Sequence, residues 1–291
     1  MQFGVGAVLS DESIDPVELG RAVEQYGFES FFCVDHTHVP VSRKTPFPQP
    51  PWEMPRDYYR TRDPFVTLAG IAAATEKLRL GTSVSLVVER DPIVMAKEVA
   101  TLDLASGGRV LLGVGAGWNR EEMENHGTDP RTRMKLMQER IEAMKEIWTK
   151  EEAEYHGRFV DFDPIFSWPK PVQDPHPPII VGGNGPTVID RIVAFGDGWI
   201  PGHQNDLGAL GARIEELEER LAAAGRDPVP VSLVFAQLDS LDRYMEIGVQ
   251  RCVFMLPAAP PEATLDRLRE IARELSAAGL LNAAAADGAK P

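Results

Sequence analysis

The feature that most constrains this chain is an eightfold alternation of apolar segments and helical segments. The apolar segments cover residues 2–8, 28–34, 78–86, 109–114, 178–181, 198–201, 229–235 and 251–256. They are apolar throughout rather than at every second position, which indicates strands buried on both faces of a sheet. A helical pattern follows each strand, and eight such units predict an α/β fold that closes into a (β/α)8 TIM barrel.

The ends of the helices are marked by local signals. Asp15-Pro16, Asp63-Pro64 and Asp91-Pro92 each precede a helical pattern, and Asp is a preferred helix cap while Pro suits the first turn. An open, doubly wound sheet is the alternative, but it usually has a glycine-rich first turn, which is absent after Val8. The barrel predicts a single domain over 1–281, with an Ala-rich tail over 282–291 that we expect to be disordered.

Two long irregular stretches, 37–62 and 152–177, lie after the second strand and between the fourth and fifth strands. The first lies on the C-terminal face, where barrel enzymes hold their active sites. Its five basic and two acidic residues suit either a solvated loop or a lid that favours anions. The aromatic residues of the two stretches either build an apolar substrate pocket or pack on the barrel: Trp52, Tyr58, Tyr59, Phe159, Phe162, Phe166 and Trp168.

Charge and composition exclude several classes of protein. Thirty Lys and Arg against 44 Asp and Glu give a net charge of −14, which argues against a broad nucleic-acid surface. No apolar run approaches the roughly 18–20 residues of a membrane span, and the start does not resemble a signal peptide. Cys33 and Cys252 sit in apolar strands, which favours buried thiols over a disulfide or a reactive thiol. We therefore expect a cytoplasmic protein that acts on a small molecule.

Two glycine-rich turns follow predicted strands. Gly182, Gly183, Asn184 and Gly185 lead into Pro186, and such a turn can present backbone N–H groups and a helix start to a phosphate. The segment Gly115-Ala116-Gly117-Trp118 allows close approach of a planar ligand. It is not the dinucleotide fingerprint, since Trp118 stands where the third glycine belongs. For both turns, ordinary tight packing is the alternative.

The segment Asp35-His36-Thr37-His38 ends the second strand. A His at this end of a barrel strand is a candidate acid, base or metal ligand. The other strand ends lack the ligands that barrel metal enzymes need, so we expect no metal. No Gly-x-Ser-x-Gly motif is present, which disfavours a serine nucleophile.

These motifs resemble a known family. The resemblance covers roughly residues 1–205 and is carried by Gly27-Phe28-Glu29-Ser30, Asp35-His36, Leu80-Gly81-Thr82-Ser83-Val84, Arg90-Asp91-Pro92, Ala100-Thr101-Leu102-Asp103, Ser106-Gly107-Gly108-Arg109-Val110-Leu111-Leu112-Gly113-Val114-Gly115-Ala116-Gly117-Trp118, Pro177-Pro178-Ile179, Gly182-Gly183 and Asp197-Gly198-Trp199. These motifs are similar to those of the luciferase-like monooxygenase superfamily. They are most similar to those of its actinobacterial branch of coenzyme F420-dependent oxidoreductases. The resemblance implies a barrel that binds a flavin or deazaflavin at its C-terminal mouth.

The resemblance also implies roles for individual residues. Asp35 and His36 would approach the reactive edge of the ring, with His36 as a catalytic acid or base or as a neutral wall of the pocket. A non-prolyl cis peptide at Ser83–Val84 would support one face of the ring. Gly115, Ala116, Gly117 and Trp118 would line the cleft. Gly182, Gly183, Asn184 and Gly185 would hold the phosphate, and Trp199 would lie beside the cofactor. The Glu that related sugar-phosphate dehydrogenases place directly after these glycines is replaced by Trp118, so their acid partner is not transferred.

The implied reaction is hydride transfer between coenzyme F420 and a small organic substrate that the sequence does not identify. The basic loop over 37–62 favours F420, because this coenzyme carries an acidic polyglutamate tail. An FMN-dependent monooxygenase and a non-catalytic flavin-binding barrel are the alternatives, and the family resemblance also implies a homodimer.

Overall fold

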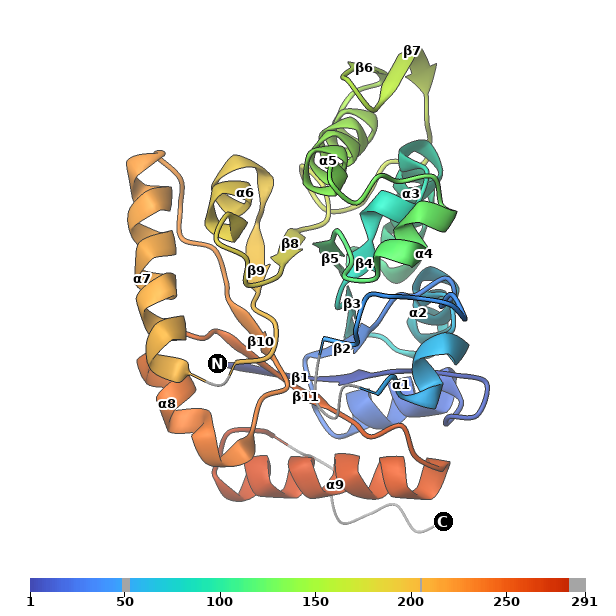
Figure 1. The fold of residues 1–291 in the computed structure, drawn as a ribbon. Helices are drawn as coiled ribbons and strands as arrows, with labels where there is room; N and C mark the ends of the chain where they lie inside the picture. Colours follow the sequence, from blue (N-terminus) through green and yellow to red (C-terminus); the bar gives the residue numbers. More distant parts are fainter. Residues whose placement is uncertain (49–52, 205, 283–291) are drawn as a thin grey trace.

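The computed structural model describes residues 1–48, 53–204 and 206–282, and these form a parallel barrel ringed by helices (Figure 1). Trp52 and the predicted tail after Asn282 lie outside the described residues. The barrel strands lie side by side in the order β10 (Ser232–Val234), β11 (Arg251–Met255), β1 (Gln2–Ala7), β2 (Ser30–Cys33), β3 (Arg79–Thr82), β5 (Val110–Gly115), β8 (Ile179–Gly182) and β9 (Gly198–Ile200). A parallel bridge between Trp199 and Val231 joins the two ends of this order, so the predicted (β/α)8 barrel is confirmed.

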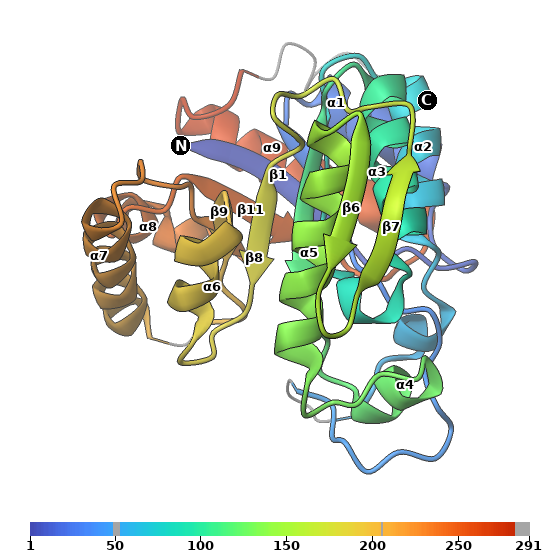
Figure 2. The ribbon, with the colours of Figure 1, turned by 90° about the horizontal axis from the view of Figure 1, so that it is seen from above.

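The helices lie around the outside of the strands (Figures 1 and 2). They are α1 (Pro16–Gln25), α2 (Pro64–Ala74), α3 (Pro92–Ser106), α4 (Arg120–Asn125), α5 (Arg133–Thr149), α6 (Val188–Phe195), α7 (Leu207–Ala223), α8 (Leu241–Glu246) and α9 (Pro261–Ala277), with short 3-10 helices η1 (Arg56–Arg60), η2 (Val87–Glu89) and η3 (Leu238–Ser240). No helix within the described residues is long and apolar enough to cross a membrane.

The Asp-Pro pairs cap helices as predicted. The Asp15 carboxylate accepts hydrogen bonds from the backbone N–H groups of Val17 and Glu18, and Asp91 does the same for Ile93 and Val94. Asp63 accepts one from Val66 at the start of α2. Each carboxylate satisfies N–H groups that have no partner within the helix, which explains the sharp helix starts. The helix predicted from Pro186 begins two residues later, at Val188.

The third predicted strand, 78–86, is interrupted. It divides into β3 and the short β4 (Ser85–Leu86), which pairs with β5. The peptide bond between Ser83 and Val84, at the break, is cis, as the family resemblance predicts. The break turns the chain toward the barrel mouth and places Val84 there.

The second long stretch, 152–177, is wrongly predicted as irregular throughout. Residues of β6 (Glu152–His156) and β7 (Asp161–Phe166) form an antiparallel hairpin that packs against α5 (Figure 2). The hairpin lies along the outer side of α5, and its turn is held by Glu139 in the middle of that helix, which accepts from the Phe159 and Val160 N–H groups. Phe166 and Trp168 are exposed, and no aromatic residue of this stretch lines the cavity described below.

Two apolar clusters hold the barrel together. The larger lies between strands and helices and includes Phe31, Leu80 and Leu112. The smaller gathers side chains from the opposite faces of the strands, which point into the barrel: Phe32, Leu111, Ile180, Ile200, Val234 and Val253. Val84, Phe235 and Met255 pack on this inner cluster, so it forms the base of the mouth. Cys33 and Cys252 are buried free thiols, which excludes the disulfide.

Candidate active site

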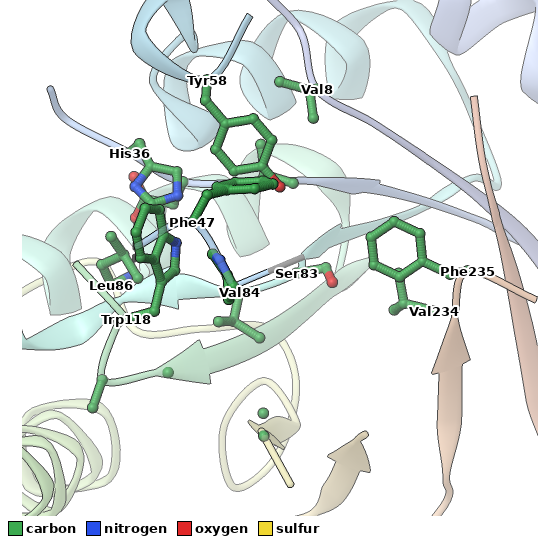
Figure 3. Close-up of a pocket in the computed structure, with 18 of the residues that line it drawn as sticks. Val8, His36, Phe47, Tyr58, Ser83, Val84, Leu86, Trp118, Val234 and Phe235 are labelled. Atoms are coloured by element: carbon green, nitrogen blue, oxygen red, sulfur yellow. Dashed lines mark hydrogen bonds between the residues drawn. The ribbon is translucent and has the colours of Figure 1, made fainter. Parts of the chain in front are cut away.

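A cavity of about 750 Å³ opens at the carboxyl ends of the strands. Figure 3 shows that its side chains come from opposite sides of the barrel, with His36, Tyr58 and Trp118 on one side and Val234 and Phe235 on the other. Most of the wall is apolar, and its residues are Val8, Val34, Phe47, Pro48, Val84, Leu86, Ala116, Trp118, Val234, Phe235, Met255 and Leu256, among others. An apolar cavity with few polar groups is the usual form of a small-molecule site.

His36 lines this cavity and is held by a buried carboxylate. Its Nδ1 lies 2.9 Å from Oε2 of Glu122, and the side chains are 6% and 0% exposed. Trp118 meets the imidazole edge-on at 5.9 Å between ring centroids, and Tyr58 lies at 5.4 Å. Glu122 therefore fixes the orientation of the ring, which suits the imidazole to acid–base chemistry.

Glu122 is the functional residue that sequence reasoning missed. The search for an acid partner stopped at Trp118, directly after the glycines, whereas Glu122 lies four residues further on, in α4. The available signal was the acidic first turn of this helix, which follows the fourth barrel strand, but it holds two acidic residues, Glu121 and Glu122, and the sequence does not tell them apart.

Asp35 borders the cavity, but its two carboxylate oxygens are already engaged. Arg90 donates to both of them, at 2.9 and 3.1 Å, while Ser85 Oγ and the Leu86 backbone N–H donate to Oδ2. These contacts tie the end of β2 to the interrupted third strand. The arrangement favours a positioning role for Asp35 over the predicted approach to a ring.

The glycines at the mouth have a packing explanation. A Cβ added at Gly115 or Gly182 would overlap a Cγ atom of Val84, and one at Gly113 would overlap the Thr82 carbonyl. Gly115 and Gly182 therefore make room for Val84, which forms part of the cavity floor. The lack of a side chain at Gly115 and Gly182 thus allows the floor of the cavity to form. Ala116, Gly117 and Trp118 line the cavity, as the resemblance implied.

The second glycine turn borders a cationic end of the cavity. Gly183 has a φ of +116°, and a Cβ there or at Gly185 would meet no atom within 4 Å, so the turn faces open space. Arg133 and Arg191 line the same end. Neither Nε atom has a hydrogen-bond partner among the described residues, and Arg191 donates through Nη1 to Thr187 Oγ1 at 2.8 Å.

Burial lowers the pKa of Arg191; the charge of Asp190 acts against this, and the charge of Arg133 acts with it. Two neighbouring arginines that no carboxylate contacts within hydrogen-bond distance, beside a glycine turn, could hold an anion. Asp190 lies next to Arg191 in sequence, but it pairs with Arg220.

Two predicted cofactor residues, Trp199 and Asn184, do not line the cavity. Trp199 is 1% exposed, and its indole N–H donates to the Gly183 carbonyl at 2.9 Å. The side chain of Asn184, which is part of the turn, accepts a hydrogen bond from the Gly202 N–H. Both side chains hold the turn in place.

None of the five basic residues of the predicted loop lines the cavity, although Arg43 lies over the ring of Trp118 at 6.0 Å. Arg56 pairs with Glu12 and Arg60 with Asp11, two acidic residues of the loop after β1. Counting charges within 37–62 alone missed this neutralisation, since the partners lie elsewhere in the sequence. The loop instead contributes Phe47, Pro48, Pro55, Asp57 and Tyr58 to the cavity wall, whereas Tyr59 is exposed.

The His-x-His segment separates into two environments. His36 faces the cavity, whereas His38 Nδ1 lies 2.9 Å from Thr37 Oγ1 and its Nε2 lies 2.9 Å from the Asn125 side-chain nitrogen. The described residues contain no group of three or more His, Cys, Asp or Glu side chains suited to hold a metal ion.

Comparison with known proteins gives the family. A family model described as luciferase-like monooxygenase matches residues 8–241. An uncharacterized protein of Mycobacterium tuberculosis is 40% identical over 282 residues, covering 95% of this chain and 99% of that protein. An F420-dependent hydroxymycolic acid dehydrogenase of the same species is 30% identical over 77% of this chain and 59% of its own length. An FMNH2-dependent dimethylsulfone monooxygenase of Pseudomonas putida is 32% identical over 53% of this chain and 43% of its own length.

Solved structures share the fold at low sequence identity. The monooxygenase RslO1 from Streptomyces bottropensis aligns with a TM-score of 0.78 at 19% identity, over 96% of this chain and 100% of that one. An F420-dependent secondary alcohol dehydrogenase in complex with an F420-acetone adduct aligns with a TM-score of 0.75 at 18% identity, over 94% and 98%. The family match, the barrel and the relatives agree, and this chain belongs to the luciferase-like monooxygenase family.

Proposed function

We propose that this protein is an oxidoreductase that transfers hydride between coenzyme F420 and a small alcohol or carbonyl compound. The deazaflavin ring supplies a carbon that accepts and gives hydride. The chain's own residues would bind this coenzyme, orient the substrate and move one proton for each hydride.

The residues at the mouth fit such a cofactor. Arg133, Arg191 and the open turn at Gly183 would hold its phosphate, since their donors have no competing carboxylate within hydrogen-bond distance. Val84, raised on the interrupted strand, would support the ring from below, and Trp118 would bound it on the side of His36. The cavity of about 750 Å³ is within the range of cofactor sites.

The observation that carries the proposal is the His36–Glu122 pair in an apolar wall. Oxidation of an alcohol releases a hydroxyl proton, and reduction of a carbonyl takes one up. An imidazole that is buried, oriented and backed by a carboxylate can hold that proton. The F420-dependent relative is named as a hydroxymycolic acid dehydrogenase and the F420-dependent structural neighbour as a secondary alcohol dehydrogenase, which supports an alcohol or carbonyl substrate.

The apolar side chains around His36 favour an apolar substrate. Phe47 stacks edge-on against Tyr58 at 4.9 Å and against Trp118 at 5.6 Å, so three rings form one wall. Phe235 faces them across the cavity from the end of β10 (Figure 3). Water bound between such surfaces is displaced at little cost, which favours carbon-rich alcohols.

Titration of the apoprotein with F420 and with FMN, each followed by fluorescence, tests the cofactor. The proposal expects tight binding of F420. Tight binding of FMN alone would favour an FMN-dependent monooxygenase. This is the competing function, because one relative is named as an FMNH2-dependent dimethylsulfone monooxygenase.

A further inference from the structure

Glu89 is a buried carboxyl group that the proposed chemistry does not yet use. It ends η2, its side chain is 1% exposed, and no donor among the described residues reaches either of its oxygens. Ionised carboxylates in protein interiors are normally paired or hydrogen-bonded, because burial without partners costs several kcal/mol. The absence of donors indicates that Glu89 carries its own proton.

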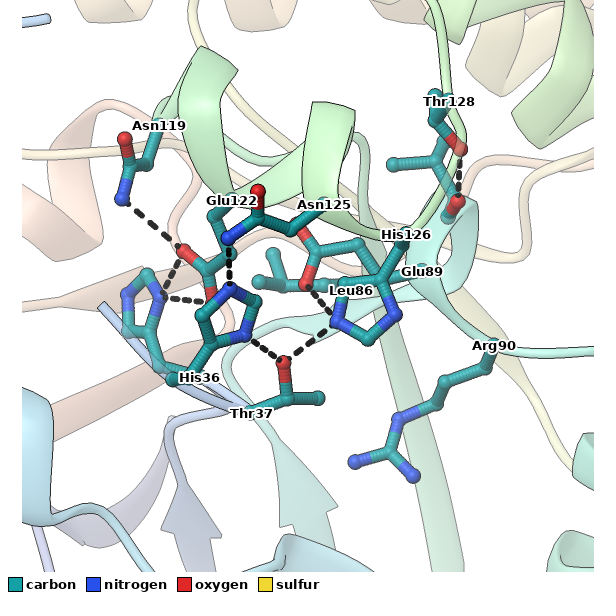
Figure 4. Close-up of polar contacts among 12 residues, drawn as sticks. His36, Thr37, Leu86, Glu89, Arg90, Asn119, Glu122, Asn125, His126 and Thr128 are labelled. Carbon is teal, nitrogen blue, oxygen red and sulfur yellow. Dashed lines mark hydrogen bonds and ion pairs between the residues drawn. The ribbon is translucent and has the colours of Figure 1, made fainter. Parts of the chain in front are cut away.

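The neighbour that accounts for this is Glu122, the carboxylate that binds His36 (Figure 4). Burial first, and then repulsion by Glu122 and Asp35, raise the pKa of Glu89 to about 9, while Arg90 acts in the opposite direction. Two adjacent carboxyl groups cannot both ionise, so they share one proton, and a hydrogen bond between Glu89 and Glu122 becomes possible. Glu122 thus connects the cavity residue His36 to a protonated acid behind it.

The outer side of Glu89 leads to the surface. His126 Nε2 lies 3.8 Å from Glu89 Oε2 and 2.7 Å from Thr37 Oγ1, which in turn contacts His38. The His126 side chain is 28% exposed. Burial lowers the pKa of His126, with His38, Arg90 and Arg140 acting in the same direction and Glu122 against it. A neutral imidazole at this place can accept a proton from one side and release one to water on the other.

We propose that Glu89 and Glu122 relay protons between His36 in the cavity and His126 at the surface. The relay rests on the proposed function, which needs one proton to cross the protein for each hydride. In alcohol oxidation, the substrate hydroxyl proton passes to the free ring nitrogen of His36, and the Nδ1 proton passes to Glu122. Glu89 gives its proton to His126, which releases one to water, and Glu89 is reprotonated from Glu122. Each residue then holds its initial number of protons, and carbonyl reduction runs the same transfers in reverse. His36 and His126 are left as their other tautomers, which return to the starting forms by exchange with water before the next turnover.

The protonation of Glu89 is tested on the protein without cofactor. Infrared spectra at pH 7, with glutamate carrying a carbon-13 carboxyl label, should show a protonated carboxylic acid that disappears in Glu89→Gln. Glu98→Gln is the matched control, since Glu98 also faces Arg90, at 3.8 Å, and burial also raises its pKa, but the Glu89 band should persist there. A spectrum without that band, or one in which Glu89→Gln leaves it unchanged, overturns the relay.

Proton transfer through the relay is tested in two ways. Glutamine has the shape of the protonated acid but cannot pass a proton on. Exchange of the His36 Nδ1 proton with water, measured by NMR without cofactor, should therefore slow at least about tenfold in Glu89→Gln. With F420 and a turned-over alcohol, kcat should fall with little change in KM, and the solvent isotope effect should rise.

The outcomes separate the two proposals. Unchanged exchange at His36, in a variant that has lost the carboxylic acid band, overturns the relay whatever the enzyme assay gives. Slowed exchange in a protein that transfers no hydride from any reductant overturns the proposed function and leaves the relay standing.

Discussion

His36 Nδ1 lies 2.9 Å from Glu122 Oε2, although 86 residues separate the two in the chain. One comes from the end of β2 and the other from α4, and the barrel brings them together because both strand ends point to the same mouth. The pair puts a group able to exchange protons into a wall that is otherwise apolar.

Removal of the imidazole should slow catalysis without weakening cofactor binding. His36→Asn keeps a polar group of similar size but cannot act as an acid or base near neutral pH. We expect kcat to fall by about 10²–10⁴, the usual contribution of a general acid or base. The affinity for F420, from fluorescence titration, should change less than about threefold. Unchanged turnover would reduce His36 to a wall of the pocket.

Loss of the carboxylate partner should act through His36. Glu122→Gln replaces the carboxylate that holds His36 Nδ1 at 2.9 Å with a neutral amide of the same shape, so we expect kcat to fall about tenfold or more while KM changes little. Steady-state kinetics of wild type and variant with the same alcohol measure this directly. An unchanged kcat would contradict the role given to Glu122.

Glu89 should make stability depend on pH. Burial and the neighbouring carboxylates raise the pKa of Glu89 in the folded state from its ordinary 4.5 to about 9, so the folded protein keeps a proton that the unfolded chain releases between these values. The free energy of unfolding should therefore fall as pH rises through this window, by at most about 1.4 kcal/mol per unit. Glu89→Gln should remove this contribution, which urea unfolding at pH 6 and pH 8 measures. A parallel pH dependence in wild type and variant would show that Glu89 is ionised in the folded state.

Val84 and Gly115 should be coupled energetically. Gly115→Ala places a methyl group where Val84 already lies, and overpacking of this kind costs about 1–3 kcal/mol. The loss should be smaller when Val84→Ala is present in the same chain. Gly70→Ala is the control: the nearest atom to the added Cβ is at 3.5 Å, in Val17, and the glycine lies in α2, where alanine is favoured. Additive losses in the double variant would contradict the contact.

The arginines should recognise the phosphate of the cofactor. Arg191→Ala removes a charged donor, and we expect affinity for FMN or F420 to fall about 10-fold or more, as for loss of a charge-assisted hydrogen bond. Riboflavin and the deazaflavin fragment without phosphate should bind wild type and variant alike. Arg220→Ala, which removes an arginine paired with Asp190 instead, should leave both affinities unchanged. Equal losses for ligands with and without phosphate would place the phosphate elsewhere.

Much of the fold was predictable because its signals are local. A run of apolar residues followed by Asp-Pro specifies a buried strand and a capped helix within about 20 residues, and the structure has these elements close to the predicted positions. The hairpin at β6 and β7 was missed, because its strands are mostly exposed and carry acidic residues and Pro164 where the barrel strands are apolar.

The site was less predictable because it depends on contacts between distant segments. Asp11 and Glu12 neutralise arginines more than 40 positions away, which no count within one loop can register. The pairing of Glu122 with His36, and the place of Glu89 behind it, follow from how α4 and η2 dock on the mouth. The sequence shows which residues are acidic, but only the folded structure shows that Glu89 and Glu122 are neighbours that can share a proton.

Hydride transfer itself tests the central claim most directly. Wild type and His36→Asn, each loaded with F420, are mixed without oxygen with a panel of primary and secondary alcohols, and loss of the oxidised F420 absorbance is followed. The account predicts that at least one alcohol reduces bound F420 in wild type, and that His36→Asn does so much more slowly. Tight binding of F420 with no hydride exchange with any alcohol, or with any carbonyl after chemical reduction, would contradict it and leave a cofactor-binding barrel without this activity.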